Sequence, residues 1–115
     1  FQTISRKEQI LPEIYENIEH LKKTNPDWEY RIFLDEDRRN FIKCHYGEDF
    51  VRLYNSISDE YGNCRADFFR YLLMYERGGV YLDLKSTCKR PLSEIIKDRD
   101  DFLVSHWRND LEQFR

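Results

Sequence analysis

Four charged residues stand at spacings that could serve chemistry. Asp67 and Arg70 are three residues apart in an otherwise apolar segment, so on a helix their side chains share one face. Asp83 and Lys85 are two residues apart in the stretch R-G-G-V-Y-L-D-L-K, so on a strand they point to one side, as Tyr81 does. An acid and a base thus come together twice. Charges in such an apolar setting are costly unless they face a partner, a cleft or a ligand.

Both groups also have an ordinary structural interpretation. Asp67 and Arg70 could form only an ion pair between neighbouring turns, which stabilises a helix by roughly 0.2–0.5 kcal/mol. Tyr81, Asp83 and Lys85 could form the solvated side of an edge strand. The charged residues taken alone leave both interpretations open.

The elements that would position these residues alternate between helix and strand. Spacing of apolar residues predicts an amphipathic helix over 10–21 that Asn25-Pro26 closes, and alternation predicts a strand over 28–34. The other expected elements are two short helices over 37–57 that break near Gly47 with Asp37 as N-cap, a buried helix from Asn63 as N-cap to Arg77, a turn at Gly78-Gly79, a buried strand over 80–84, a turn at Pro91, a helical turn over 92–96 and a strand over 102–106. This alternation predicts an α/β fold with partly parallel strands, in which ligands bind at the carboxyl ends of the strands.

Composition limits the class of protein. A chain of 115 residues with eight Phe and eight Tyr predicts a single domain, 1–115, with an aromatic-rich core. Positive and negative residues are interspersed, so nucleic acid is not an expected partner. No apolar run approaches the roughly 20 residues that span a bilayer, so no membrane contact is expected within this segment.

The three cysteines indicate neither a zinc site nor a dense disulfide framework. Cys44, Cys64 and Cys88 are far apart and form no C-x-x-C pair. We expect three free thiols, or one disulfide and one thiol. Cys44 and His45 could be metal ligands, but neighbouring residues on a helix diverge in direction and no third ligand can be named.

Residues 65–85, R-A-D-F-F-R-Y-L-L-M-Y-E-R-G-G-V-Y-L-D-L-K, resemble the signature of glycosyltransferase family 32, the sugar-binding region with a D-x-D motif. This family includes mannosyltransferases and the catalytic domains of glucosylating toxins. The segments N-P-D-W-E-Y and F-L-D-E-D-R-R-N-F-I resemble its second strand and helix, and Phe1-Gln2-Thr3 resembles the end of its first strand. The resemblance implies a GT-A fold, a Rossmann-like α/β sandwich with a mostly parallel sheet and flanking helices. Residues 1–115 would then be the donor-binding half, a fragment of a longer chain.

The resemblance also implies an enzyme and the roles of its residues. The enzyme would transfer a hexose from GDP-mannose or a UDP-hexose to a hydroxyl of a glycan, lipid or protein, with retention of configuration. Asp67 and Arg70, next to Ala66, would bind the hexose, and Arg70 would also neutralise the departing diphosphate. Asp83 would accept hydrogen bonds from the ribose and reach a metal through water. Gln2, at the end of the first strand, would lie near the nucleotide, and Tyr81 would line the site.

Lys85 departs from the family pattern, because it replaces the second Asp of D-x-D, which ordinarily binds Mn²⁺ or Mg²⁺. Lys85 could supply the positive charge itself and make the transferase metal-independent. Alternatively, Asp83, the diphosphate and a carboxylate beyond residue 115 hold the metal, with Lys85 as an auxiliary phosphate contact. A third hypothesis is a catalytically inactive nucleotide-sugar-binding or interaction domain in which Lys85 pairs with Asp83. The intact Asp67 and Arg70 favour a transferase; the location, cytoplasm or Golgi lumen, stays open.

Overall fold

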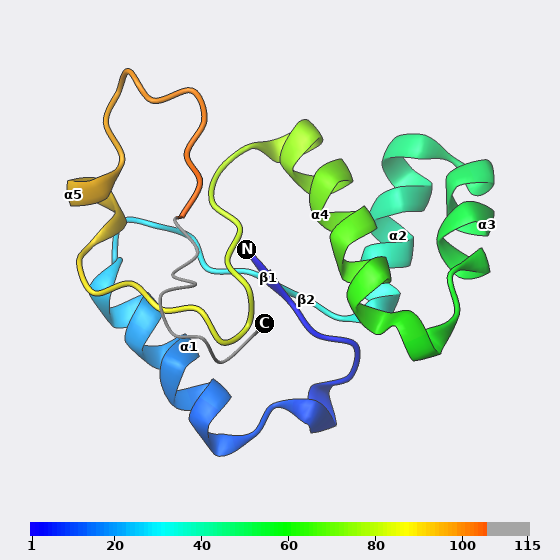
Figure 1. Cartoon of the computed structure of the whole chain (residues 1–115), viewed down its shortest axis with the longest axis horizontal. Helices are drawn as coiled ribbons and strands as arrows, with labels where there is room; N and C mark the ends of the chain where they lie inside the picture. Colours follow the sequence, from blue (N-terminus) through cyan, green and yellow to red (C-terminus); the bar gives the residue numbers. More distant parts are fainter. Residues whose placement is uncertain (106–115) are drawn as a thin grey trace, which may run out of the picture.

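The computed structural model describes residues 1–105, in which helices and short strands alternate (Figure 1). Helices α2, α3 and α4 lie on one side of the two strands, and α1 and α5 lie on the other (Figure 1). In chain order the elements are β1 (Gln2–Thr3), η1 (Lys7–Gln9), α1 (Pro12–Thr24), β2 (Ile32–Phe33), α2 (Asp35–Tyr46), α3 (Glu48–Ser56), η2 (Asp59–Tyr61), α4 (Gly62–Arg77) and α5 (Leu92–Ile95), where η1 and η2 are 3-10 turns.

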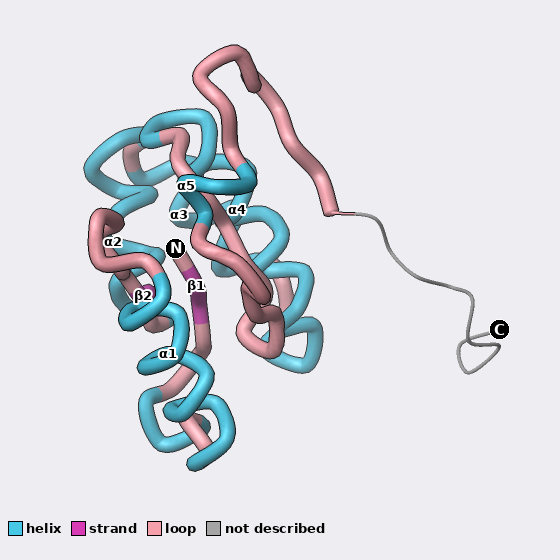
Figure 2. The backbone as a smooth tube through the Cα atoms, turned by 90° about the vertical axis from the view of Figure 1, so that its left-hand side faces the viewer, coloured by secondary structure: helices cyan, strands magenta, loops and turns pink. Residues whose placement is uncertain are grey.

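The strands β1 and β2 form a parallel pair near the middle of the molecule. Gln2 stands opposite Ile32, and the Ile4 N–H donates to the Phe33 carbonyl (3.0 Å). Figure 2 shows how short both strands are in a molecule built mainly of helices and loops. The parallel pair confirms the expected mixture of helices with parallel strands.

The strand predicted over 28–34 is longer than the observed one, and the strand predicted over 80–84 is absent. Only Ile32 and Phe33 of the first form a strand, and they pair with the two residues of β1, Gln2 and Thr3. Residues 80–84 form no strand and are not fully buried. Two backbone hydrogen bonds hold this segment beside β1: the Phe1 nitrogen donates to the Val80 carbonyl (2.7 Å), and the Leu82 N–H donates to the Phe1 carbonyl (3.0 Å).

The C-terminal strand predicted over 102–106 is also absent as far as the structure describes it. Residues 102–105 have no regular secondary structure and are exposed, and His106 lies outside the described residues. The helical turn predicted over 92–96 is confirmed as α5. The break near Gly47 is confirmed too, since this glycine separates α2 from α3 with φ +82°.

The core is rich in aromatic residues, as the composition predicts. Its main cluster of buried residues comes from four elements and consists of Phe33, Ile42, Tyr54, Phe69 and Leu73. The rings of Phe33 and Phe69 lie 5.1 Å apart between centroids. Because aromatic pairs in tilted geometries add to the free energy of area burial, this cluster fixes β2 and α4 against each other.

Helix α4 buries one face rather than its whole circumference. Phe69 and Leu73, one turn apart, are fully buried, but Tyr71 and Tyr75 are 71% and 84% exposed. The prediction of a fully buried helix is therefore wrong, since its apolar residues exceed the surface that α2 and α3 can cover. No helix in residues 1–105, α4 included, has the length and apolar character needed to cross a membrane.

Two predicted N-caps are displaced from their expected positions. Helix α2 starts at Asp35, and the Asp37 carboxylate lies within its first turn, where it accepts a hydrogen bond from the Leu34 N–H (2.9 Å). Helix α4 starts at Gly62, one residue before Asn63. Asp37 thus still satisfies a backbone N–H at the helix start, but from inside the helix instead of from the cap position.

Helix α1 has the amphipathic pattern that the sequence predicts. Ile18 and Leu21 are buried, and Asn25 ends the helix by donating from its backbone and its side chain to the Leu21 carbonyl. The Asn25 side-chain oxygen also accepts from the Leu92 N–H (2.7 Å). One residue therefore caps α1 and attaches the start of α5 to it.

Candidate functional site

An open, polar cleft of about 660 Å³ lies between the end of β1, the N-terminal half of α4 and the segment 81–84. Five residues predicted from the sequence line it: Ala66, Asp67, Arg70, Tyr81 and Asp83. The first three come from α4, and the other two follow the Gly78-Gly79 turn, whose glycines have φ of +61° and +83°. Since this backbone region favours glycine, the turn lets the chain reverse and place both groups at one cleft.

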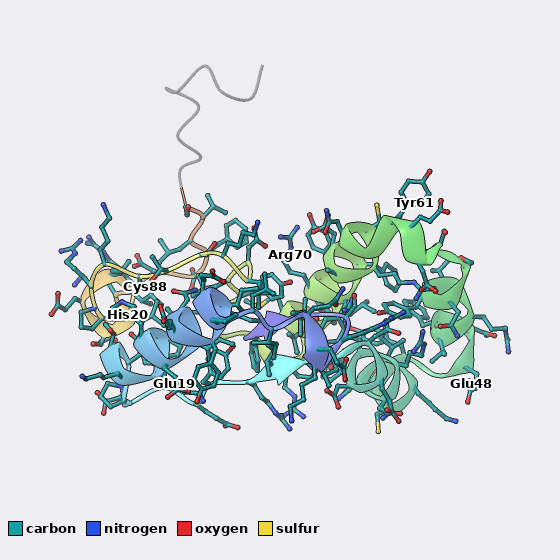
Figure 3. The ribbon with its side chains drawn as sticks, turned by 90° about the horizontal axis from the view of Figure 1, so that it is seen from below. Glu19, His20, Glu48, Tyr61, Arg70 and Cys88 are labelled. Carbon is teal, nitrogen blue, oxygen red and sulfur yellow. The ribbon has the colours of Figure 1, made fainter. Side chains whose placement is uncertain are left out.

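Arg70 lies between two carboxylates in this cleft. Its Nη2 is 2.9 Å from Asp67 Oδ1, and its Nη1 is 3.7 Å from Asp83 Oδ1. The side chains of Asp67 and Asp83 are 57% and 65% exposed, whereas that of Arg70 is 31% exposed. The carboxylates therefore keep acceptor capacity for ligand hydroxyls, and the guanidinium keeps donors for an oxyanion. In Figure 3 Arg70 lies near the middle of the molecule, between Glu48 at one end and His20 and Cys88 at the other.

Tyr81 completes this group as a neutral phenol. The Arg70 guanidinium carbon lies 5.5 Å from the centroid of the Tyr81 ring, which is cation–π range. Burial raises the pKa of Tyr81, the Asp83 carboxylate raises it further, and the Arg70 charge opposes the rise. The phenol is therefore protonated at neutral pH and can both donate and accept a hydrogen bond.

Gln2 does not line the cleft but holds one of its walls. Its side chain is 1% exposed, and its Nε2 donates to the Asp83 carbonyl (3.0 Å). Its Oε1 accepts from the Tyr30 hydroxyl (2.7 Å). Both ends of the Gln2 amide are thus used within the protein, and the residue ties β1 to the backbone that carries the Asp83 carboxylate.

Lys85 lies in a turn instead of on a strand. The Ser86 N–H donates to the Asp83 carbonyl (2.8 Å), so Leu84 and Lys85 are the central residues of a β-turn. The alternation that would have put Asp83 and Lys85 on one side is therefore wrong. Within the described residues Asp83 pairs with Arg70 and not with Lys85, which is exposed and does not line the cleft.

Within residues 1–105 the cysteines and histidines form no comparable site. All three cysteines are free thiols, with Cys88 buried and the other two exposed. The His45 ring contacts the Phe41 ring in a tilted arrangement (4.3 Å between ring centroids), and His45 faces Glu76 rather than a thiol. Residues 1–105 contain no group of three His, Cys, Asp or Glu side chains placed to hold a metal ion.

A second cavity, of about 200 Å³, has mostly apolar walls. Trp28, Val80 and Leu82 line it, whereas their neighbours Tyr81 and Asp83 line the polar cleft, so the segment 80–83 separates the two. None of the predicted charged site residues reaches the apolar cavity. The polar cleft is therefore the better candidate for a hydroxyl-rich, anionic ligand.

Sequence reasoning missed the contributions of Ser5 and Arg38. Ser5 lines the cleft, and its hydroxyl accepts a hydrogen bond from Arg38 Nη2 (3.2 Å). Arg38 belongs to the charged run D-E-D-R-R-N, which is typical of a solvated helix start, and its burial has no signature in the sequence. Ser5 stands in no recognisable spacing with the other site residues.

The family model of the glycosyltransferase sugar-binding region containing the DXD motif matches residues 12–103. This match confirms the resemblance that residues 65–85 indicate. It spans α1 to α5 and includes the five predicted residues that line the cleft, but not Gln2. No solved structure is significantly similar to the chain.

Several mannosyltransferases are similar in sequence. Inositol phosphoceramide mannosyltransferase 3 of Schizosaccharomyces pombe is 40% identical over 72 residues, which cover 63% of this chain and 19% of that protein. Inositol phosphoceramide mannosyltransferase 1 of the same organism is 29% identical over 103 residues, 86% of this chain and 31% of the relative. An initiation-specific alpha-1,6-mannosyltransferase of Candida albicans is 30% identical over 89 residues, 76% and 23% of the two chains. The chain thus spans less than a third of the length of these relatives.

Proposed function

This chain belongs to the family of the glycosyltransferase sugar-binding region containing the DXD motif, and from that premise we propose that it binds the donor in an enzyme that transfers a hexose from a nucleoside-diphosphate sugar to an acceptor hydroxyl. One observation carries the proposal: Asp67, Arg70 and Asp83 meet in one open cleft, with Arg70 between the carboxylates. A GT-A fold and retention of configuration belong to the same proposal.

Each cleft residue has a role that its geometry supports. Asp67 accepts hydrogen bonds from hexose hydroxyls, because its carboxylate is more than half exposed and is oriented by Arg70. Arg70 donates to the diphosphate and stabilises its charge as the glycosidic bond breaks. Asp83 accepts hydrogen bonds from the ribose hydroxyls, and the Tyr81 ring packs against the Arg70 guanidinium at the side of the site.

Mannose is the hexose we propose, with GDP-mannose as the first donor to test and UDP-hexoses as the alternatives. The relatives that share sequence with this chain are named as mannosyltransferases. Two of these names specify inositol phosphoceramide as the acceptor, so a lipid that carries a phosphate and sugar-like hydroxyls is the first acceptor to test, before glycans.

The cation requirement depends on Lys85. Members of this family generally use a divalent cation, and Asp83 is the carboxylate at the first position of the motif. Asp83 would hold the cation together with the diphosphate, since hard cations prefer carboxylate and phosphate oxygens. The cation would supply positive charge to the leaving diphosphate, a task that Arg70 shares. Chelation by EDTA decides the matter: activity that is lost supports a cation, and activity that persists supports the metal-independent alternative with Lys85.

The proposed function is tested by assaying the full chain for donor hydrolysis and mannosyl transfer, with and without Mn²⁺. We expect Asp83→Asn to lower the rate at least about a hundredfold, because it removes a charge from the reacting site. Asp49→Asn is the matched control, since its side chain is 85% exposed and lies outside the cleft. Donor binding without turnover would favour the inactive binding domain, and no binding of any nucleotide sugar would refute the proposal.

A further inference from the structure

Arg38 is a buried cation whose hydrogen-bonding capacity is mostly unused. It is 1% exposed, and its Nε and Nη1 have no hydrogen-bond partner in the described residues. The one hydrogen bond of its side chain goes from Nη2 to Ser5 Oγ, a neutral acceptor. Fully buried arginines are rare unless they are paired, and each unsatisfied buried group calls for an explanation.

Arg65 shows what a satisfied buried arginine looks like in the same molecule. It is 7% exposed, donates to the Ile57 carbonyl (2.7 Å) and forms an ion pair with Asp59. The Arg38 guanidinium has neither a carbonyl nor a carboxylate partner in residues 1–105. Its positive charge is therefore not compensated locally.

Ser5 connects this charge to the cleft. Its hydroxyl accepts from Arg38, so the hydrogen of that hydroxyl points elsewhere, and no described acceptor takes it. Ser5 lines the cleft, and a Cβ added to Gly62 at the start of α4 would lie 4.0 Å from Ser5 Oγ. Burial raises the pKa of the cleft residue Tyr81, and the charge of Arg38 opposes this rise. The buried guanidinium thus lies immediately behind the polar wall of the cleft.

The N-terminus of α4 meets Ser5 at that wall. No side chain caps this helix, and its first turn contains no acidic residue. A helix of 16 residues presents unpaired N–H groups and partial positive charge at this end. Among the nearby cleft carboxylates, Asp59 is paired with Arg65 and Asp67 with Arg70. The combination of a free hydroxyl, free helix N–H groups and a buried cation suits an anion.

We propose that Ser5 and the N-terminus of α4 form a binding subsite for a phosphate group, with Arg38 behind Ser5 as its positioning residue. Ser5 and the first N–H groups of α4 contact the phosphate oxygens, and Arg38 orients the Ser5 hydroxyl and supplies the compensating charge. The phosphate belongs to the donor diphosphate or to a phosphorylated acceptor, so the biological ligand rests on the proposed function, whereas the subsite itself does not.

The subsite is tested with inorganic phosphate against the full chain, at constant ionic strength, by calorimetric titration and thermal unfolding. We expect phosphate to bind and to raise the unfolding temperature. Arg38→Met weakens phosphate binding about tenfold or more, because a charge-assisted arrangement is lost. It leaves the stability of the phosphate-free protein equal or higher, because an unpaired buried charge is removed. The charge-matched control Arg52→Met, 73% exposed on α3, leaves both values unchanged.

Ser5→Ala gives an independent readout should Arg38→Met fold poorly. It removes the contacting hydroxyl but keeps the cation, so phosphate affinity falls, and the phosphate-free protein unfolds at a somewhat lower temperature because the Arg38 guanidinium loses its acceptor. Unchanged phosphate affinity in Ser5→Ala and Arg38→Met, or no phosphate binding by the unmodified chain, overturns the proposal.

The source of the phosphate follows from competition. Displacement of phosphate by UDP or GDP assigns the subsite to the donor diphosphate, and simultaneous binding assigns it to an acceptor; both outcomes support the subsite. Phosphate binding without binding of any nucleotide sugar keeps the subsite and refutes the proposed function. If nucleotide sugar binds but neither substitution changes phosphate affinity, the proposed function is supported and the subsite is refuted.

Discussion

Replacing Gln2 with Leu separates a role in holding the cleft wall from direct contact with a nucleotide. The family resemblance predicts that Gln2 lies near the nucleotide, but its amide is fully used inside the protein. Leu has a similar volume and no polar atoms, so the substitution removes hydrogen bonds and leaves almost no cavity. The expected result is a large loss of stability together with weaker donor binding, because the Asp83 backbone loses its attachment to β1.

The magnitude follows from the two short hydrogen bonds. The contacts to the Tyr30 hydroxyl (2.7 Å) and the Asp83 carbonyl (3.0 Å) count, whereas the 3.5 Å contact to the Leu84 carbonyl is too long to add much. Each net hydrogen bond contributes about 1 kcal/mol, and a partner left unsatisfied costs about 1–3 kcal/mol. Because Tyr30 is half-buried and can turn to water, we expect a loss of about 2–4 kcal/mol in the free energy of unfolding.

Urea unfolding measures this loss, and calorimetric titration with nucleotide sugar measures donor affinity. Tyr30→Phe removes only one of the hydrogen bonds and should cost about 1–2 kcal/mol. The double variant should cost about 1 kcal/mol less than the sum of the single changes, because the two residues share that bond. A Gln2→Leu variant of unchanged stability that no longer binds nucleotide sugar would refute this reasoning and restore Gln2 as a ligand contact.

Three further predictions concern Arg70, Phe69 and Tyr30. Arg70→Ala should weaken nucleotide-sugar binding at least about tenfold in calorimetry. It should change the free energy of unfolding by less than about 1 kcal/mol, because the ion pairs of Arg70 with exposed carboxylates stabilise little. A purely structural Arg70 would instead lower the free energy of unfolding and leave nucleotide-sugar affinity unchanged. Phe69→Ala should lower the free energy of unfolding in urea by about 3–5 kcal/mol, because Phe69 is fully buried. The control Tyr75→Ala should lower it by less than about 0.5 kcal/mol, because Tyr75 is 84% exposed. Equal losses in the two variants would contradict the assignment of the core. Burial raises the pKa of Tyr30 to about 12, so the stability that this residue contributes is complete below its ordinary pKa of about 10 and is lost as the pH rises toward 12. The free energy of unfolding, measured from pH 9 to 12, should therefore fall less steeply with pH in Tyr30→Phe than in the unmodified chain. Identical slopes would rule this out.

Helices were easier to predict from the sequence than strands. The apolar spacing in α1 and the paired glycines after α4 report local preferences, and both predictions are confirmed. Alternation over 28–34 and 80–84 shows only that side chains can point to opposite sides. A strand also needs a neighbouring backbone to pair with. In residues 1–105, only Ile32 and Phe33 of the first segment pair with β1, and the backbone of the second segment bonds only to that of Phe1. That requirement is a property of the whole fold and leaves no local pattern.

The candidate site was predictable where residues lie within one continuous signature. Asp67, Arg70, Tyr81 and Asp83 belong to residues 65–85, and the structure brings them to one cleft. Lys85 was misplaced because a turn interrupts the alternation at Asp83. The contributions of Ser5 and Arg38 depend on contacts between elements far apart in the sequence, which composition and spacing do not encode.

The hydrogen bonds between β1 and the segment 80–83 determine when the cleft can form during folding. They join residues 79 and 81 positions apart in the sequence, from Phe1 to Val80 and from Gln2 to Asp83. Contacts of such long range require closure of a large loop before they contribute any stability, which slows folding. On the ribosome, β1 can pair with β2 as soon as residues 32 and 33 are available, but the cleft cannot form before α4 and the segment 80–83 have left the exit tunnel.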